Sequence, residues 1–166
     1  MKNVVLAVIF LAILTPLRAL GADFSGQWTL DSSASESMTP IFDMQEVSWA
    51  KRQMASTLDK SFAIVQGADR MTVTYSNALG TIDQVLLFNN QPHTTRNPAG
   101  QNVTLKTQWR GETLVSSGST PVGEAGTGIV TASRTLSQDG NTLNVTINLK
   151  SGDQNATVKR VFRRVQ

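Results

Sequence analysis

The stretch Phe24-Ser25-Gly26-Gln27-Trp28-Thr29-Leu30 is interpreted as the first strand of a β-barrel that the rest of the chain closes. Side chains alternate across an extended chain, so Phe24, Gly26 and Trp28 share one face and the polar residues between them share the other. Gly26 leaves room for a close backbone approach, which allows the Trp28 indole to plug one end of a closing sheet. Because Gly-x-Trp is a short pattern, an ordinary first strand with one buried Trp is the alternative interpretation.

An apolar leader precedes this strand. Met1-Lys2-Asn3 is a short positive region, 4–14 is an unbroken apolar run, and small residues near Gly21 and Ala22 offer a cleavage site. This pattern is typical of a secretory signal peptide, and the run is too short to span a bilayer. We therefore expect a signal peptide over 1–22, one domain over 23–166, and a periplasmic or extracellular location. With no cysteine, the chain has neither a lipoprotein anchor nor a disulfide.

The charge of the chain does not indicate a nucleic-acid partner. The formal net charge is +3, but Lys2 and Arg18 leave with the leader, so 13 basic residues face 12 acidic ones in the mature chain. The one local excess of basic residues lies in the last predicted strand, at Lys159, Arg160, Arg163 and Arg164. We interpret it as a solvated terminal strand, because a polyanion surface needs a larger basic patch.

One helix is expected after the first strand. Thr39 is the predicted N-cap and Pro40 the first helical residue. Met44, Val47 and Lys51 fall on one stripe, and the pattern predicts a single helix from about Pro40 to Leu58.

From Phe62 onward, short alternating runs are separated by turn residues, which is the signature of an all-β protein. The nine predicted strands are Phe62–Val65, Arg70–Ser76, Ile82–Phe88, His93–Arg96, Val103–Trp109, Thr113–Ser116, Ile129–Leu136, Leu143–Leu149 and Ala156–Arg164. A glycine-rich stretch over Gly118–Gly126 is predicted to be a mobile hairpin loop. Hairpins in series favour an antiparallel up-and-down β-barrel of about ten strands, which closes to remove its edges. Eight strands is the second choice and an open β-sandwich the third.

Four segments carry a resemblance to a known superfamily. They are Phe24–Asp31, Trp109–Val115, Leu136–Leu143 and Lys159–Phe162. Together they resemble the calycins, and the first resembles a group of small secreted bacterial lipocalin-like proteins that open with F-S-G-x-W-x-L. A helix after strand one is similar to the plan of the fatty-acid-binding proteins, where it lids the barrel, whereas lipocalins have eight strands and their main helix near the C-terminus. The resemblance implies a fold more than a function.

The same resemblance draws attention to Arg160. Fatty-acid-binding proteins carry Arg-x-Tyr in the last strand, and both side chains hold a ligand carboxylate; the matching positions here read Arg160-Val161-Phe162, without the Tyr hydroxyl. Calycin barrels also stack an Arg from a late strand on the Gly-x-Trp indole. The favoured role of Arg160 is therefore closure of the barrel with Gly26 and Trp28, and the second is a ligand anchor. Arg134, inside another apolar run, is suited to either part.

The sequence contains few residues that are suited to catalysis or metal binding. His93 is the one histidine, it lies in a polar segment, and we expect it to be exposed. A lone His builds neither a zinc site nor a triad without carboxylate partners, so no enzyme activity, metal or cofactor is expected.

The favoured function is binding of a small apolar or amphipathic ligand, such as a fatty acid or other lipid, inside a monomeric barrel. The predicted ligand-binding residues are Arg160, Phe162, Arg134, Tyr75, Val73 and Leu105. The alternative is a filled barrel that serves as a structural or protein-interaction module of the cell envelope, with no ligand and with its function on the loops.

Overall fold

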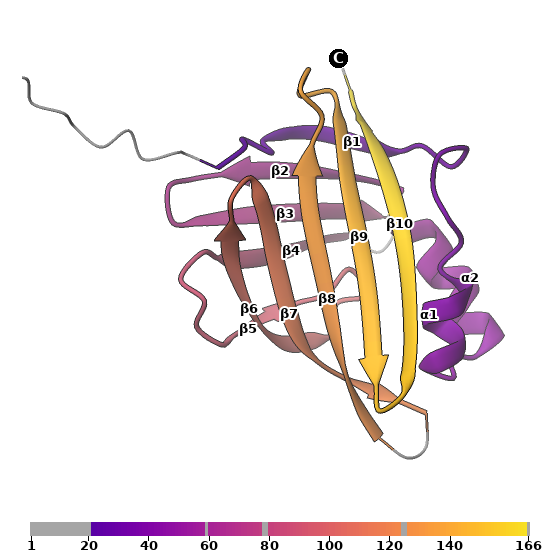
Figure 1. Ribbon diagram of the computed structural model, residues 1–166. Coiled ribbons are helices and arrows are strands. Elements are labelled where there is room, and N and C mark those ends of the chain that lie inside the picture. Colours follow the sequence, from indigo (N-terminus) through magenta and orange to yellow (C-terminus); the bar gives the residue numbers. More distant parts are fainter. Residues whose placement is uncertain (1–20, 59, 78–79, 124–125, 166) are drawn as a thin grey trace, which may run out of the picture.

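The computed structural model describes residues 21–165 except 59, 78–79 and 124–125, so the leader predicted over 1–22 lies almost wholly outside the described residues. Ten strands and two short helices follow one another along the chain (Figure 1). They are β1 (Gly26–Leu30), α1 (Thr39–Met44), α2 (Trp49–Leu58), β2 (Ser61–Gln66), β3 (Arg70–Asn77), β4 (Gly80–Leu87), β5 (His93–Arg96), β6 (Asn102–Arg110), β7 (Thr113–Val122), β8 (Gly126–Leu136), β9 (Thr142–Ser151) and β10 (Gln154–Arg164).

All ten strands belong to one antiparallel sheet with the order β4-β3-β2-β1-β10-β9-β8-β7-β6-β5. Each strand pairs with its neighbours in sequence except at the β4–β5 step, and β1 pairs with β10, where Trp28 faces Arg164 and Leu30 faces Phe162. The first and last strands therefore lie side by side, as Figure 1 shows. The predicted ten-strand up-and-down barrel is confirmed, and the eight-strand and sandwich alternatives are wrong.

The barrel is closed at its remaining seam by side chains. β4 and β5 end the hydrogen-bonded order of the sheet, and two side-chain bonds between described residues cross from β5 to the backbone of Val85 in β4. Thr95 Oγ1 accepts the Val85 N–H at 2.8 Å, and His93 Nε2 lies 3.0 Å from the Val85 carbonyl oxygen. His93 is consequently half-buried, so the expectation of an exposed histidine is wrong.

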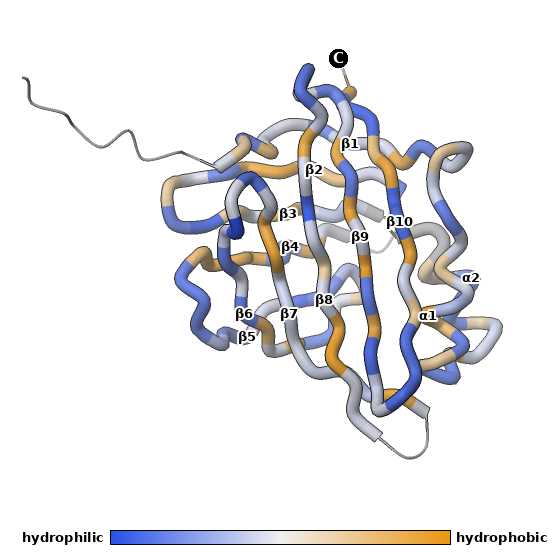
Figure 2. The backbone as a smooth tube through the Cα atoms, in the orientation of Figure 1, coloured by the Kyte–Doolittle hydropathy of each residue, from blue (hydrophilic) through white to orange (hydrophobic). Residues whose placement is uncertain are grey.

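Alternation along the strands places the core inside the barrel. Figure 2 shows hydrophobic and hydrophilic residues alternating along β9 and β10, which is the pattern of a wall with one dry and one wet face. The larger core cluster includes Phe24, Trp28, Phe62 and Phe162. A second cluster joins Ile41 of α1 to apolar residues of β7, β9 and β10.

The lid consists of two helices, so the prediction of a single helix from Pro40 to Leu58 is wrong. The chain breaks after Met44, where Glu46 adopts a left-handed φ of 51° and the Val47 N–H bonds back to the Phe42 carbonyl oxygen at 2.9 Å. The break allows α1 to pack on β10 while α2 contacts β3.

The start of α1 also differs from the expectation. The N-cap is Met38, and it makes no side-chain capping bond; Thr39 is already helical, with its hydroxyl paired to Ser37 Oγ at 2.7 Å. Pro40 does lie in the first turn, as its fixed φ and missing N–H favour.

The glycine-rich stretch over Gly118–Gly126 is mostly strand, which corrects the prediction of a loop. β7 continues to Val122 and β8 begins at Gly126, with 124–125 outside the described residues. The glycines fit close packing: a Cβ on Gly118 would lie 2.5 Å from the Thr104 carbonyl oxygen, and one on Gly128 would lie 2.9 Å from that of Lys150.

The base of the barrel closes around Trp28, which is fully buried and donates its indole N–H to the Phe24 carbonyl oxygen at 2.9 Å. The guanidinium over this indole belongs to Arg164, whose Cζ lies 4.5 Å from the ring centroid. The prediction that Arg160 fills this place is wrong, because the β1–β10 register puts Arg164 opposite Trp28. Gly26 has the expected role: a Cβ there would collide with the Arg164 guanidinium.

Candidate ligand-binding cavity

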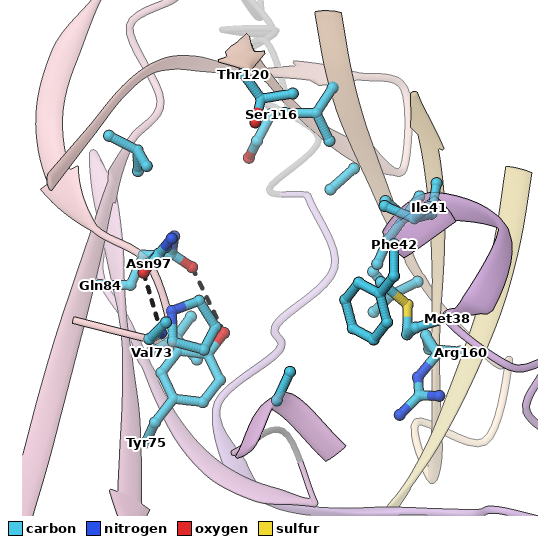
Figure 3. Close-up of a pocket in the computed structure, with 18 of the residues that line it drawn as sticks. Met38, Ile41, Phe42, Val73, Tyr75, Gln84, Asn97, Ser116, Thr120 and Arg160 are labelled. Carbon is cyan, nitrogen blue, oxygen red and sulfur yellow. Dashed lines mark hydrogen bonds between the residues drawn. The ribbon is translucent and has the colours of Figure 1, made fainter. Parts of the chain in front are cut away.

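A cavity of about 770 Å³ occupies the barrel interior below the lid (Figure 3). This volume lies within the range of small-molecule sites, which is about 300–1,000 Å³. The structure therefore contradicts the alternative of a filled barrel. All six residues predicted to bind ligand line this cavity: Arg160, Phe162, Arg134, Tyr75, Val73 and Leu105. Their ligand-binding role stays a prediction.

One side of the cavity is aromatic and apolar. Phe62 of β2 lies between Tyr75 of β3 and Phe162 of β10, with ring centroids 5.6 Å and 4.8 Å from its own. Ile64 and Val73 continue this surface across β2 and β3. Such a wall binds apolar carbon chains by burial without fixing their orientation.

Arg134 supplies the main polar feature. It projects from β8 into the barrel, where the wall encloses it and its remaining exposed surface faces the cavity. Its Nη1 donates to Ser116 Oγ at 3.1 Å, and Ser116 in turn accepts from Thr107 Oγ1 at 2.9 Å. Burial lowers the pKa of the Arg134 guanidinium, and the nearby Tyr75 acts in the opposite direction.

No carboxylate of a described residue forms an ion pair with Arg134. A guanidinium remains charged in proteins and is rarely enclosed without an anionic partner. Arg134 is therefore a donor-rich site for an anion that enters the cavity.

Arg160 has different partners from Arg134. It belongs to the same cross-strand row as Arg134, separated from it by Val145 of β9. Its Nη1 donates to the Glu36 carbonyl oxygen at 3.0 Å, and Figure 3 shows it beside Met38 under the lid. Arg160 thus ties the segment before α1 to β10, while still lining the cavity.

The charges around the cavity all have one sign. Among the described lining residues are four basic side chains and no acidic one. Of the four, Arg52 is neutralised by Asp43, with Nη1 and Oδ1 2.6 Å apart. Low-dielectric walls with one sign of charge attract ligands of the opposite sign, so the interior favours an anion.

Sequence reasoning missed two buried polar residues of the cavity lining. Gln84 and Ser116 are nearly inaccessible, and Gln84 Oε1 lies 3.5 Å from the Tyr75 hydroxyl. A signal existed for both, since Gln84 has the same parity as Leu86 in β4 and Ser116 the same parity as Leu114 in β7. A polar residue at an inward position of a barrel strand is a candidate for ligand contact.

The described residues contain no group of three or more His, Cys, Asp or Glu residues placed to hold a metal ion. No helix that they form has the length and apolar character needed to cross a membrane.

Comparison with known proteins gives a clear result for the fold. No protein-family model and no curated protein sequence matches the chain. Among solved structures, a Schistosoma mansoni fatty acid binding protein in complex with arachidonic acid aligns with a TM-score of 0.68 and 22% identity, over 86% of this chain and 96% of that one. The REP1-NXSQ fatty acid transporter gives 0.67 and 17%, over 87% and 97%.

A zebrafish ileal bile acid-binding protein complexed with cholic acid aligns with a TM-score of 0.62 and 16% identity, over 86% of this chain and 98% of that one. These structures are of binding or transport proteins. The chain therefore has the calycin-type barrel of the fatty-acid-binding proteins, which confirms the fold that the sequence resemblance implied.

Proposed function

We propose that this protein binds a small amphipathic molecule with an anionic head, such as a fatty acid, inside the barrel. The observation that carries the proposal is the enclosed Arg134 guanidinium, which faces an apolar cavity and has no acidic partner among the described residues. The aromatic wall of β2, β3 and β10 accepts the apolar body of the ligand. The ligands named for proteins of the same fold support this assignment.

The binding mode follows from the groups that hold the two arginines. Arg160 is held by the backbone of the lid segment, whereas Arg134 turns toward the interior. The anionic head therefore lies at Arg134, with Ser116 as a second polar contact, and the apolar tail extends toward α1 and α2. The described residues place no acid–base pair beside Arg134, and the proposal is a carrier, not an enzyme.

The test combines native mass spectrometry with ligand displacement. The protein purified without denaturation is expected to carry an acid of lipid size that delipidation removes. Oleate is then expected to displace a fluorescent fatty acid about 10–150 times better than oleyl alcohol, which corresponds to the 1.5–3 kcal/mol of a hydrogen bond to a charged group. A ligand-free spectrum together with no displacement by either compound contradicts the proposal.

We also propose that the protein is exported and acts as a monomer in the periplasm or outside the cell. The leader supports export, and the fold suits cleavage at the Gly21–Ala22 bond. The Gln66 side chain forms hydrogen bonds to both ends of Ala22–Phe24, the segment just after this bond. Its Nε2 donates to the Ala22 carbonyl oxygen and its Oε1 accepts the Phe24 N–H, each at 3.0 Å. Cleavage after Gly21 keeps both bonds, whereas cleavage after Ala22 removes the first.

The mass of the intact mature protein tests this. We expect a chain that begins at Ala22 in the exported fraction. A chain that retains Met1, or one that begins after Phe24, contradicts the proposed export and processing.

A further inference from the structure

One wall of the cavity carries hydroxyl groups and small residues from the interior up to the lid. Three inward positions of β7 line the cavity, Ser116, Gly118 and Thr120, between the buried Leu114 and Val122. Figure 3 shows Ser116 and Thr120 on one side of the cavity and Tyr75 on the other. The cavity is therefore asymmetric, with a hydroxylated wall on β7 and an aromatic wall on β2, β3 and β10.

The hydrogen bonds of Ser116 leave one hydrogen without an acceptor. A hydroxyl has one donor hydrogen and two acceptor lone pairs. Ser116 Oγ accepts from Thr107 Oγ1 at 2.9 Å and from Arg134 Nη1 at 3.1 Å, which uses both lone pairs. No described protein group accepts its own hydrogen, so this O–H is available to a molecule in the cavity.

Thr120 is in a similar position near the lid. Its Oγ1 accepts from Gln45 Nε2 at 2.9 Å, at the end of α1, and the described residues again offer its hydrogen no acceptor. Thr120 and Ser116 are four residues apart on one strand face, so they are separated by roughly 13 Å at about 3.3 Å per residue. The β7 wall thus presents two donors, one beside Arg134 and one well removed from it.

We propose that the natural ligand is an oxygenated acid, with a hydroxyl or keto oxygen along its body in addition to the anionic head. This inference rests on the proposed function. The head lies at Arg134 and Ser116, and the second oxygen accepts the Thr120 hydrogen. Thr120 is partly buried, and a plain acyl chain that covers it takes this O–H out of water without offering an acceptor, which is unfavourable. The aromatic wall opposite contacts the unsubstituted side of the ligand.

Ricinoleate and oleate form a matched pair for the test, because they differ by one mid-chain hydroxyl. Both are titrated against a bound fluorescent fatty acid with the wild-type protein, Thr120→Val, and Thr146→Val as a control on the exposed face of β9. Valine keeps the shape of threonine and removes its hydroxyl. The wild type is expected to bind ricinoleate about 2–10 times more tightly than oleate, as one neutral hydrogen bond provides. Thr120→Val is expected to abolish this preference, and Thr146→Val to keep it.

The results separate the inference from the function on which it rests. If oleate binds and ricinoleate binds no better, or if Thr120→Val keeps the preference, the second contact is refuted and the carrier function stands. If neither acid displaces the probe, the proposed function itself fails. Ser116→Ala distinguishes the two polar contacts further, since it is expected to weaken both acids equally through Arg134.

Discussion

Replacing Arg134 with methionine is expected to separate stability from binding. The guanidinium is enclosed by the barrel and makes one bond to a neutral group, Ser116. Removing a charge from water costs several kcal/mol, and replacing buried ionic groups by apolar ones of similar volume is commonly neutral or stabilising by about 1–4 kcal/mol. The free energy of unfolding of ligand-free Arg134→Met is therefore expected to stay the same or to rise within that range.

Binding is expected to change in the opposite direction. The variant lacks the charge-assisted bond to the anionic head, worth about 1.5–3 kcal/mol, so the affinity for oleate falls about 10–150-fold. Oleyl alcohol, which carries no charge, is expected to lose little. The greater stability of a variant that binds less well is the signature of a residue retained for its ligand.

Urea unfolding of the delipidated proteins and displacement of a fluorescent fatty acid measure the two effects. Arg110→Met, at the exposed end of β6, is the matched control and is expected to change neither. The reasoning is refuted if Arg134→Met lowers the free energy of unfolding by about 2 kcal/mol or more and leaves the oleate affinity unchanged, because Arg134 is then a structural residue.

Three further substitutions test the fold. Gly26→Ala is expected to cost about 1–3 kcal/mol of stability in urea unfolding, because Gly26 has a φ of 139° and a Cβ there collides with Arg164; an unchanged midpoint refutes this account of closure. Hydrogen bonds from Ser33 and then Arg163 lower the pKa of Asp31 to about 2. The contribution of the Asp31 carboxylate to stability is complete above its unfolded pKa of about 3.9 and is lost as the pH falls through about 2. Asp31→Asn should therefore flatten the pH dependence of the urea midpoint between these two values. Identical pH profiles for the wild type and the variant contradict this. Glu46→Gly should be about 1 kcal/mol more stable than Glu46→Ala, because Glu46 has a left-handed φ of 51°; equal stability argues against a strained break between the helices.

The barrel was predictable because its strands have an amphipathic pattern that alternates with period two. Every inward position of β9 is apolar, from Leu143 to Leu149, and turns with Asp139-Gly140 and Gly152 separate the last hairpins. The pairing of β1 with β10 followed from the need to cover two sheet edges. These features are local or require only closure, so sequence patterns contain them.

What the sequence did not reveal depends on long-range register. Arg160, Phe162 and Arg164 have the same parity, so alternation alone cannot tell which side chain lies over Trp28; only the pairing of Trp28 with Arg164 decides it. The break between α1 and α2 at Glu46, where φ is 51°, likewise falls within the apolar stripe that predicted one helix, so helical periodicity does not reveal it.

Part of the candidate site was predictable from the alternation of inward and outward residues along the strands. Arg134 was recognised because it interrupts an apolar run, and Tyr75 because it shares a face with Val73. Ser116 and Gln84 were missed, since serine and glutamine are common on the outer face of any strand and only their inward parity distinguishes them. That Arg134 reaches Ser116 from the neighbouring strand depends on the β7–β8 register.

A crystal structure of the delipidated protein with oleate added tests the central claim most directly. We predict continuous ligand density inside the barrel, with the carboxylate within hydrogen-bond distance of the Arg134 guanidinium and the tail directed toward α1 and α2. Density that places the carboxylate at the mouth beside Arg160, or a barrel that stays empty at saturating oleate, contradicts the account.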